Sequence, residues 1–291
     1  MTGPAKSYFN GLLRLHKQLV AGLVRRILKN VEPGAACKIK NFVQVISRRS
    51  VRFSYDGGKD LYAACEMDRR TFFSERLRGF DLYGRGIQAR GDWLCWSYGV
   101  DQIEFRTDDV VIDCGANFAD LYIGLSKVEP NIRYISFEPS RREFECIKLN
   151  APGQEHHNMA LMDKPGTLDF YISSQGGDSS LFVTKRAFTE VVKVQATSLD
   201  EFARGIEKIK LLKLEAEGAE PEVLEGAKKT LERIEYIAVD GGRERGLSKA
   251  STIEHVSNTL IRNGFEMLYM DLPTGWGRAL FRNARINDAS G

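Results

Sequence analysis

Hydrophobic residues along the chain fall into two alternating patterns. Short apolar runs that end at an acid are typical of strands buried in a parallel sheet, and they predict strands at 109–113, 133–137, 210–214 and 235–240. Between these runs, apolar residues recur at helical spacing and predict helices over 119–127, 140–150, 219–229 and 251–263. Strands that alternate with helices predict an α/β fold, a doubly wound Rossmann-like sheet with helices on both faces.

Weaker patterns add detail to this framework. Further strands are predicted at 157–161, 167–172 and 191–196, and a closing hairpin at 265–271 and 278–282. A serine followed three residues later by glutamate is typical of a capping box at a helix start. This pattern predicts helix caps at Ser140, Ser198 and Ser251.

The beginning of the chain is basic and predicts an N-terminal helical extension. Residues 7–30 are expected to form an amphipathic helix that ends before Pro33. Residues 1–50 hold ten Lys and Arg against Glu32 alone, a net charge of +9, so the remaining residues carry −6. Such a helix suits the surface of an anionic membrane. Packing on the main domain or on a second subunit of a homo-oligomer is favoured, because the helix has few aromatic anchors.

Length and composition limit the class of protein. The 291 residues are 43% hydrophobic and 28% charged, as in soluble globular proteins, and the net charge of +3 does not favour nucleic-acid binding. We expect an extension over 1–69, one α/β domain over 70–285 and a tail over 286–291. Within that domain, arginines and aromatic residues over 70–105 predict a cap above a ligand site.

The cysteines and the apolar runs predict a cytoplasmic protein. Five cysteines without a CxxC or Cys/His cluster indicate a reducing compartment and argue against structural zinc. No stretch approaches the ~18 consecutive apolar residues of a spanning helix. The apolar run over 19–28 is broken by Arg25 and Arg26, so it does not read as a cleavable signal peptide.

Acids follow four of the predicted strands, where a parallel sheet binds its ligands. They are Asp113, Glu138, the pair Glu215 and Glu217, and Asp240. The turn after Asp113 lacks the G-x-G-x-x-G pattern of a dinucleotide site, and its acid would repel phosphate. An acid at the next strand end, Glu138, can accept hydrogen bonds from ribose hydroxyls. These features favour a phosphate-free nucleoside with a positive group, a combination found in S-adenosylmethionine.

Several ordered segments resemble one known family. Residues 110–117 (VVIDCGAN), 136–139 (SFEP), 197–200 (TSLD) and 212–227 (LKLEAEGAEPEVLEGA) are similar to the FkbM-type S-adenosylmethionine-dependent methyltransferases, and the resemblance covers roughly 70–285. It implies O-methylation of a hydroxyl on a sugar, glycolipid, polysaccharide or polyketide-like compound. Ala119 stands where the family usually has glycine, and Glu215 where it usually has aspartate.

The strand-end acids and the resemblance together suggest roles for individual residues. Methyl transfer to a hydroxyl needs a base for its proton, and the predicted catalytic pair is Glu215 and Glu217. The expected cofactor residues are Asp113, Gly115, Ala116, Asn117, Glu138, Asn158 and Ala160. Asp240 and Arg243 are expected on the substrate side.

Other roles stay open from the sequence. Glu215 and Asp240 offer oxygen ligands to a divalent cation, but two acids are weak evidence for one. His156 and His157 follow a predicted helix and are alternative bases.

A binding protein that kept the fold but lost the chemistry is the alternative function, motivated by Ala119 and Glu215. The retained strand-end acids favour an enzyme. A nucleic-acid methyltransferase is disfavoured, because no Asn/Asp-Pro-Pro-aromatic motif follows the strand at 210–214.

Overall fold

The computed structural model describes residues 22–173, 179–183, 188–271 and 277–287. Within these ranges, no helix is both long and apolar enough to cross a membrane. Most of the predicted helix over 7–30, the turn of the closing hairpin and most of the predicted tail lie outside the described residues. The described part of that helix, 22–30, ends at Asn30, as the sequence predicts.

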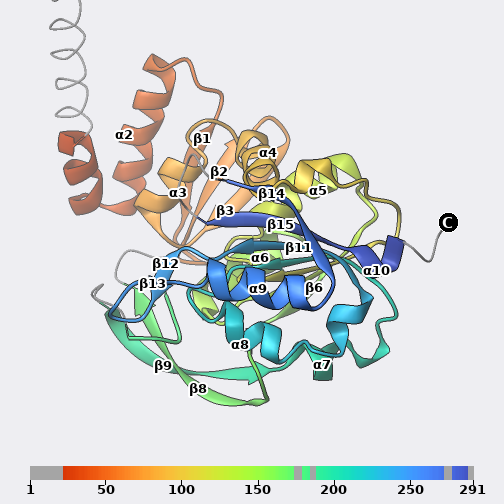
Figure 1. The fold of residues 1–291 in the computed structure, drawn as a ribbon. Helices are drawn as coiled ribbons and strands as arrows, with labels where there is room; N and C mark the ends of the chain where they lie inside the picture. The colour runs from red at the N-terminus through yellow and green to blue at the C-terminus, as the bar shows by residue number, and fades with distance from the viewer. Residues whose placement is uncertain (1–21, 174–178, 184–187, 272–276, 288–291) are drawn as a thin grey trace, which may run out of the picture.

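A seven-stranded mixed sheet forms the centre of the fold, in the order β14-β15-β11-β10-β4-β5-β6 (Figure 1). Its five parallel strands are β4 (Val110–Cys114), β5 (Arg133–Phe137), β6 (Glu155–His157), β10 (Ile209–Leu214) and β11 (Ile234–Asp240). At one edge, the antiparallel hairpin is β14 (Phe265–Met270) and β15 (Arg278–Asn283). The predicted α/β sheet and its closing hairpin are confirmed.

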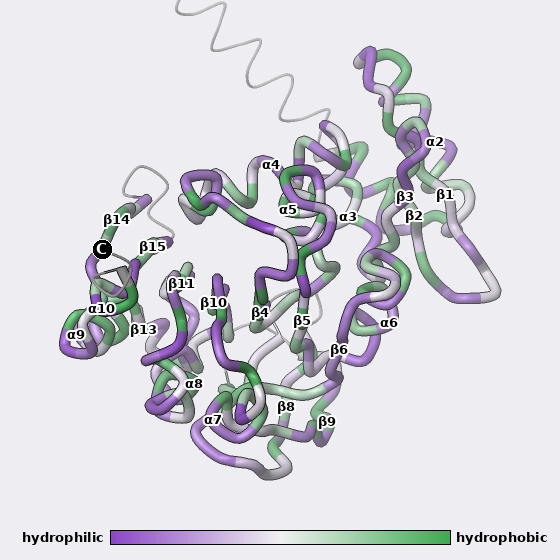
Figure 2. Tube along the Cα trace, turned by 90° about the vertical axis from the view of Figure 1, so that its right-hand side faces the viewer, coloured by the Kyte–Doolittle hydropathy of each residue, from purple (hydrophilic) through white to green (hydrophobic). Residues whose placement is uncertain are grey.

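Helices cover both faces of this sheet (Figure 2). On one face lie α4 (Ile87–Ser97), α5 (Asp120–Val128) and α6 (Arg141–Asn150), and on the other α7 (Leu199–Phe202), α8 (Glu220–Glu225) and α9 (Ile253–Arg262). Successive strand residues point to opposite faces, so Val111 packs in the first layer and Ile112 in the second. Both are fully buried, which explains the unbroken apolar runs.

Residues 33–82 hold structure that the sequence analysis did not predict. Pro33 ends the first helix but also opens a second, where its missing N–H costs nothing. The elements are α2 (Pro33–Ile46), β1 (Arg52–Asp56), β2 (Leu61–Glu66), β3 (Arg69–Phe73) and α3 (Arg76–Leu82). The three strands form an antiparallel sheet, and β3 runs across the predicted boundary between 69 and 70, which stays a prediction.

Smaller elements complete the chain. The predicted strand over 157–161 is divided, because β7 (Ala160–Leu161) joins a separate sheet in the order β7-β9-β8. The other members of that sheet are β8 (Gly166–Ser173) and β9 (Phe188–Thr197). The remaining elements are β12 (Arg243–Arg245), β13 (Ala250–Ser251), α10 (Ala284–Asn287) and the 3-10 turns η1 (Val100–Gln102), η2 (Ala203–Gly205) and η3 (Thr230–Arg233).

The three predicted helix caps differ in how their serine side chains bond. The Ser198 hydroxyl accepts a hydrogen bond from the Glu201 N–H at 3.2 Å. Ser140 is the N-cap residue of α6, as predicted, but the capping bond is absent, because the Ser140 hydroxyl donates to the Glu143 carboxylate instead of accepting from the helix backbone. At Ser251, α9 begins one residue later than expected, after Thr252, but the Ser251 hydroxyl accepts a hydrogen bond from the Ile253 N–H at the start of that helix, at 3.3 Å.

Asn150, at the end of α6, joins the small sheet to the main domain. Its Oδ1 accepts from the Phe72 N–H at 2.6 Å, and its Nδ2 donates to the carbonyl oxygens of Phe72 and Phe118 at 2.9 and 2.8 Å. One side chain therefore satisfies three backbone groups from two distant segments.

We expect Asn150→Ala to lower the free energy of unfolding by about 2–4 kcal/mol, because backbone groups at this contact lose their partners. Asn131→Ala, at an exposed position, is the control and should change it by less than about 0.5 kcal/mol. Urea denaturation of both variants measures the difference. Equal values would show that Asn150 does not hold the two parts together.

Candidate active site

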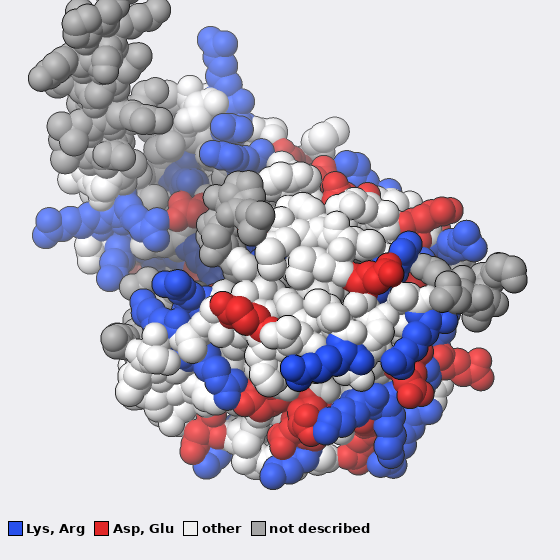
Figure 3. All heavy atoms as spheres, viewed as in Figure 1, with Lys and Arg blue, Asp and Glu red and all other residues white. Residues whose placement is uncertain are grey.

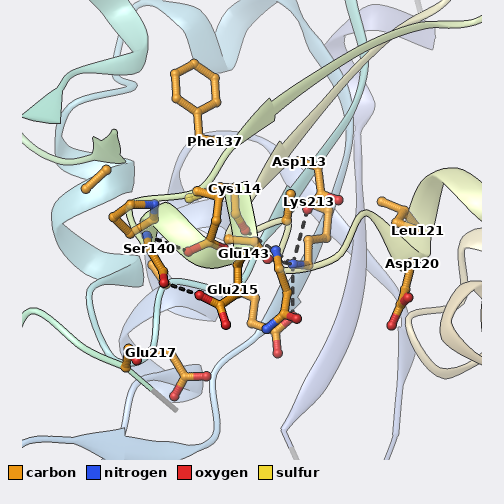
Figure 4. A pocket seen from close by; sticks show the side chains of 18 of the residues that line it. Asp113, Cys114, Asp120, Leu121, Phe137, Ser140, Glu143, Lys213, Glu215 and Glu217 are labelled. Carbon is orange, nitrogen blue, oxygen red and sulfur yellow. Dashed lines mark hydrogen bonds and ion pairs between the residues drawn. The ribbon is translucent and has the colours of Figure 1, made fainter. Parts of the chain in front are cut away.

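A cavity of about 270 Å³ opens at the carboxyl ends of β4, β5 and β10 (Figure 4). It lies where the strand-end rule places a ligand site. Eight of the predicted site residues line it: Asp113, Gly115, Ala116, Asn117, Glu138, Ala160, Glu215 and Glu217. The structure therefore brings together most of the residues selected from the sequence.

The turn after β4 wraps closely around the end of β10. Gly115 has a φ of +74°, and a Cβ at this position would lie 1.9 Å from the Glu215 carbonyl oxygen. Only glycine fits so close an approach. Ala119 also has a left-handed backbone, with a φ of +61°. This explains why glycine suits that position, and why alanine there costs about 1–2 kcal/mol.

Glu138 lies at the end of β5, with its carboxylate buried in the wall of the cavity. The carboxylate accepts hydrogen bonds from the N–H groups of Asn117 and Ser140, both at 2.9 Å. Burial, together with the nearby Glu143 carboxylate, raises the pKa of Glu138 to about 7. Its lone pairs can accept further hydrogen bonds, as two ribose hydroxyls would require.

Asn117 offers a second indication that the cavity holds a polar ligand. Its carboxamide oxygen is buried and accepts no hydrogen bond from any residue that the structure describes. A buried polar atom without a partner is costly unless a ligand or water satisfies it. Together with the carboxylate of Glu138, this acceptor fits a nucleoside rich in hydroxyl and amino groups. The residues present fit S-adenosylmethionine.

Lys213 is the functional residue that the sequence analysis missed. Its ammonium lies inside the sheet, at 3.1 Å from the Asp113 carboxylate, 2.9 Å from the Glu215 carboxylate and 2.6 Å from the Gly115 carbonyl oxygen. Burial alone would lower the pKa of Lys213, but the two carboxylates raise it above its usual value. The sequence signal that indicates it is a lysine between two leucines, shortly before the acids that follow the strand.

The two predicted catalytic acids have different surroundings. Glu215 accepts a hydrogen bond from the Tyr98 hydroxyl at 2.8 Å besides its ion pair with Lys213. Burial would raise its pKa, but Lys213 and Arg278 lower it to about 2. Glu217 follows in a left-handed turn, with a φ of +50°, and its side chain lines the cavity. Glu215 is therefore held as an ionised anchor, and Glu217 adds a second acid to the cavity from the turn that follows it.

Three predicted residues do not line the cavity. Asn158 instead braces the turn after β5, because its Nδ2 donates to the Glu138 and Pro139 carbonyl oxygens at 2.8 and 3.0 Å. Asp240 forms an ion pair at 2.8 Å with Arg278, which does line the cavity. Arg243 is exposed on β12.

The remaining candidates for bases and metal ligands are occupied elsewhere. His156 lies within hydrogen-bond distance of the Ser136 hydroxyl and the Ala151 carbonyl oxygen, and burial lowers its pKa. His157 stacks on Phe137 outside the cavity lining. Among the described residues, no group of three His, Cys, Asp or Glu side chains is arranged to hold a metal ion.

The segment predicted to form a cap supplies one wall of the cavity. Arg78, Arg90 and Trp93 line it, whereas Trp96 is exposed. The guanidinium carbons of Arg90 and Arg278 lie 5.0 and 5.3 Å from the centre of the Trp93 ring. An aromatic ring beside arginines suits a ligand with both apolar faces and polar edges.

Comparisons with known proteins identify the family of the chain. Residues 113–267, more than half of the chain, match the model of the methyltransferase FkbM domain. The chain is 25% identical over 183 residues to the 2-O-methyltransferase NoeI of Sinorhizobium fredii, covering 56% of this chain and 74% of that protein. It is 27% identical over 213 residues to the AMB antimetabolite synthetase AmbE of Pseudomonas aeruginosa, covering 58% of this chain and 10% of that protein.

Solved structures give more distant likenesses. Aeropyrum pernix fibrillarin, with natively bound S-adenosyl-L-methionine, is 14% identical with a TM-score of 0.40, covering 79% of this chain and 97% of that one. A TehB-like SAM-dependent methyltransferase from Corynebacterium glutamicum is 11% identical with a TM-score of 0.41, covering 72% and 94%. From the family match and the strand-end site, the chain belongs to the FkbM methyltransferase family, and its cofactor is S-adenosylmethionine.

Proposed function

We propose that this protein is an O-methyltransferase that methylates a sugar hydroxyl in a glycolipid, a polysaccharide or a polyketide-like small molecule. The observation that carries the proposal is the convergence of Glu138, Glu215 and Glu217 on one cavity. The match to a 2-O-methyltransferase supports transfer to oxygen.

The cofactor side of the cavity is formed by the ends of β4 and β5. Glu138 is proposed to accept hydrogen bonds from the ribose hydroxyls, with Asn117 beside it. Gly115 and Ala116 bring the backbone close to the ligand, and Asp113 acts through Lys213. Ala160 lies near the expected adenine, and Asn158 supports the turn on which Glu138 stands.

The acceptor side supplies a base and a fixed charge. When bound, S-adenosylmethionine supplies a methyl group on a positively charged sulfur. Transfer of that methyl group to an acceptor hydroxyl would need a base for the hydroxyl proton, and the Glu217 carboxylate would accept that proton. Glu215 is a weaker base, because its pKa of about 2 leaves little affinity for a proton. It holds Lys213 and Tyr98 in place, and Asp240 acts on the substrate side through Arg278.

A catalytically weak or inactive binding protein is the second candidate, and the left-handed Ala119 is the observation that favours it. Against it, the cavity retains the ribose acid and the catalytic acid together.

The N-terminal helix offers both of the contacts considered from the sequence, on different faces. Leu28 is buried, and the Arg76 guanidinium donates to the Leu28 and Val31 carbonyl oxygens at 2.6 and 2.7 Å. Leu23 and Ile27 remain 61% and 41% exposed. Figure 3 shows Lys and Arg side chains gathered around the neighbouring α2. We propose that one face packs on the domain and that the other meets an anionic membrane carrying the acceptor; a homo-oligomer stays a prediction.

The first prediction concerns Glu138. At pH 8, Glu138→Ala should weaken binding of S-adenosylhomocysteine by about 10- to 100-fold, the effect of losing hydrogen bonds to a charged group. In the unmodified protein, affinity should fall by up to about tenfold per pH unit below about 7, because protonation removes the carboxylate that accepts. Glu138→Ala should lose this pH dependence. Calorimetric titration tests both, with Glu145→Ala, at an ion pair on α6, as control.

The second prediction concerns Glu217. Glu217→Gln should keep the affinity for S-adenosylhomocysteine but slow methyl transfer by about 100-fold or more, as for loss of a general base. Turnover is followed by mass spectrometry of a glycolipid extract as a gain of one CH₂ unit. Glu225→Gln, paired with Lys228 at the surface, should transfer at the normal rate. Unchanged transfer in Glu217→Gln would move the base to Glu215 or a histidine.

The third prediction concerns the exposed helix face. The protein should sediment with vesicles that contain anionic lipid at low salt and dissociate at high salt, since each basic residue near the surface adds about 1 kcal/mol. Replacing both Leu23 and Ile27 by serine should weaken sedimentation. Val128→Ser, an exposed valine on α5, should not. If the protein did not sediment with the vesicles at low salt, the proposed membrane contact would be wrong, and the helix would serve only to pack on the domain.

A further inference from the structure

The methionine part of the cofactor presents a carboxylate to a strongly acidic cavity. Six acids line the cavity: Asp113, Asp120, Glu138, Glu143, Glu215 and Glu217. They suit the ammonium and sulfonium groups of the cofactor but repel its carboxylate. The described cations in the lining are Arg78, Arg90, Lys213 and Arg278, and a cation with free hydrogen-bond donors would offset this repulsion.

Two of these cations are committed to other partners. The Lys213 ammonium is 3% exposed and forms ion pairs with Asp113 and Glu215 besides its bond to the Gly115 carbonyl oxygen. Arg278 donates from Nε to Asp240 at 2.8 Å and from Nη1 to the Ser97 hydroxyl at 2.7 Å. Lys213 therefore links the ends of β4 and β10, and Arg278 links the central sheet to α4.

Arg90 is placed differently. It stands on α4, and its side chain is only 13% exposed. Its Nε donates to the Asp120 carboxylate at 2.7 Å, and its guanidinium lies over the Trp93 ring. Among the described residues, its two terminal nitrogens, Nη1 and Nη2, form no hydrogen bond. The Nε side of the guanidinium is thus fixed by Asp120. The two terminal nitrogens, which have the geometry to bind a carboxylate through two hydrogen bonds, remain available for a ligand.

Asp120 connects this arginine to the cofactor turn. It is the first residue of α5, which follows directly on the turn that contains Gly115 and Asn117. Its other carboxylate oxygen accepts from the buried Tyr83 hydroxyl, so its position is fixed from two sides. Arg78 stands on α3, where its charge acts on Glu75.

We propose that Arg90 binds the α-carboxylate of the cofactor through its terminal nitrogens, with Asp120 and Trp93 holding the guanidinium in plane. The inference rests on the assigned cofactor but not on the proposed acceptor. The same fork would hold an acid group of an acceptor, so the test has to separate the two sources of carboxylate.

The test compares two ligands that differ in the amino-acid part. S-adenosylhomocysteine carries the carboxylate, and 5′-methylthioadenosine has the same nucleoside and sulfur without it. Arg90→Gln should weaken the binding of S-adenosylhomocysteine by about 10- to 100-fold. The affinity for 5′-methylthioadenosine should stay within about twofold of the unmodified protein. Arg90→Lys keeps the positive charge but loses the paired terminal nitrogens, so its affinity for S-adenosylhomocysteine should lie between those of Arg90→Gln and the unmodified protein. Arg85→Gln, an exposed neighbour, is the matched control.

The ratio of the two dissociation constants within one variant cancels any general loss of folding. The proposal is overturned if Arg90→Gln weakens both ligands equally or neither of them. It is also overturned if Arg78→Gln, and not Arg90→Gln, removes the preference for S-adenosylhomocysteine. If Arg90→Gln weakened only the binding of acidic acceptors, Arg90 would be assigned to the acceptor instead of the cofactor. Failure of the proposed O-methylation would appear separately, as normal ligand binding without transfer.

Discussion

A single buried ammonium holds the site together. The Lys213 side chain sits between the ends of two neighbouring parallel strands and forms ion pairs with Asp113 on β4 and with Glu215, directly after β10. Without that charge, the two carboxylates would be buried close together in a medium that penalises each of them. Removing one partner from such a network typically costs about 3–5 kcal/mol. The acidity that suits a cationic cofactor is therefore possible only because the lysine lies beneath it.

The second constraint is space at the turn between β4 and α5. Gly115 lets the backbone meet the Glu215 carbonyl oxygen, which also allows the Lys213 ammonium to bond to the Gly115 carbonyl oxygen. Asn117 and Ala119 continue the turn in left-handed conformations. The strain is offset by the hydrogen bond from the Asn117 N–H to Glu138, which links the cofactor acid to the same turn.

The wall opposite the strand ends is built by the N-terminal part of the chain. Arg90 and Trp93 reach the cavity from α4, which packs on α5. The small sheet and α3 lie behind them, with Phe73 and Phe80 in one aromatic cluster. Tyr83 and Asp120 join this wall to the cofactor turn. The part of the chain outside the family match thus completes the pocket that the matched part begins.

The sequence by itself determined the alternation of strands and helices and the acids at the strand ends, because both depend on neighbours within a few residues. It also indicated the cofactor through Asp113 and Glu138. Only the tertiary structure decided that Lys213 bridges two acids and that Arg90 joins the site, since these contacts connect segments far apart in the chain. The small sheet was missed because β2 is buried along most of its length and shows no alternation.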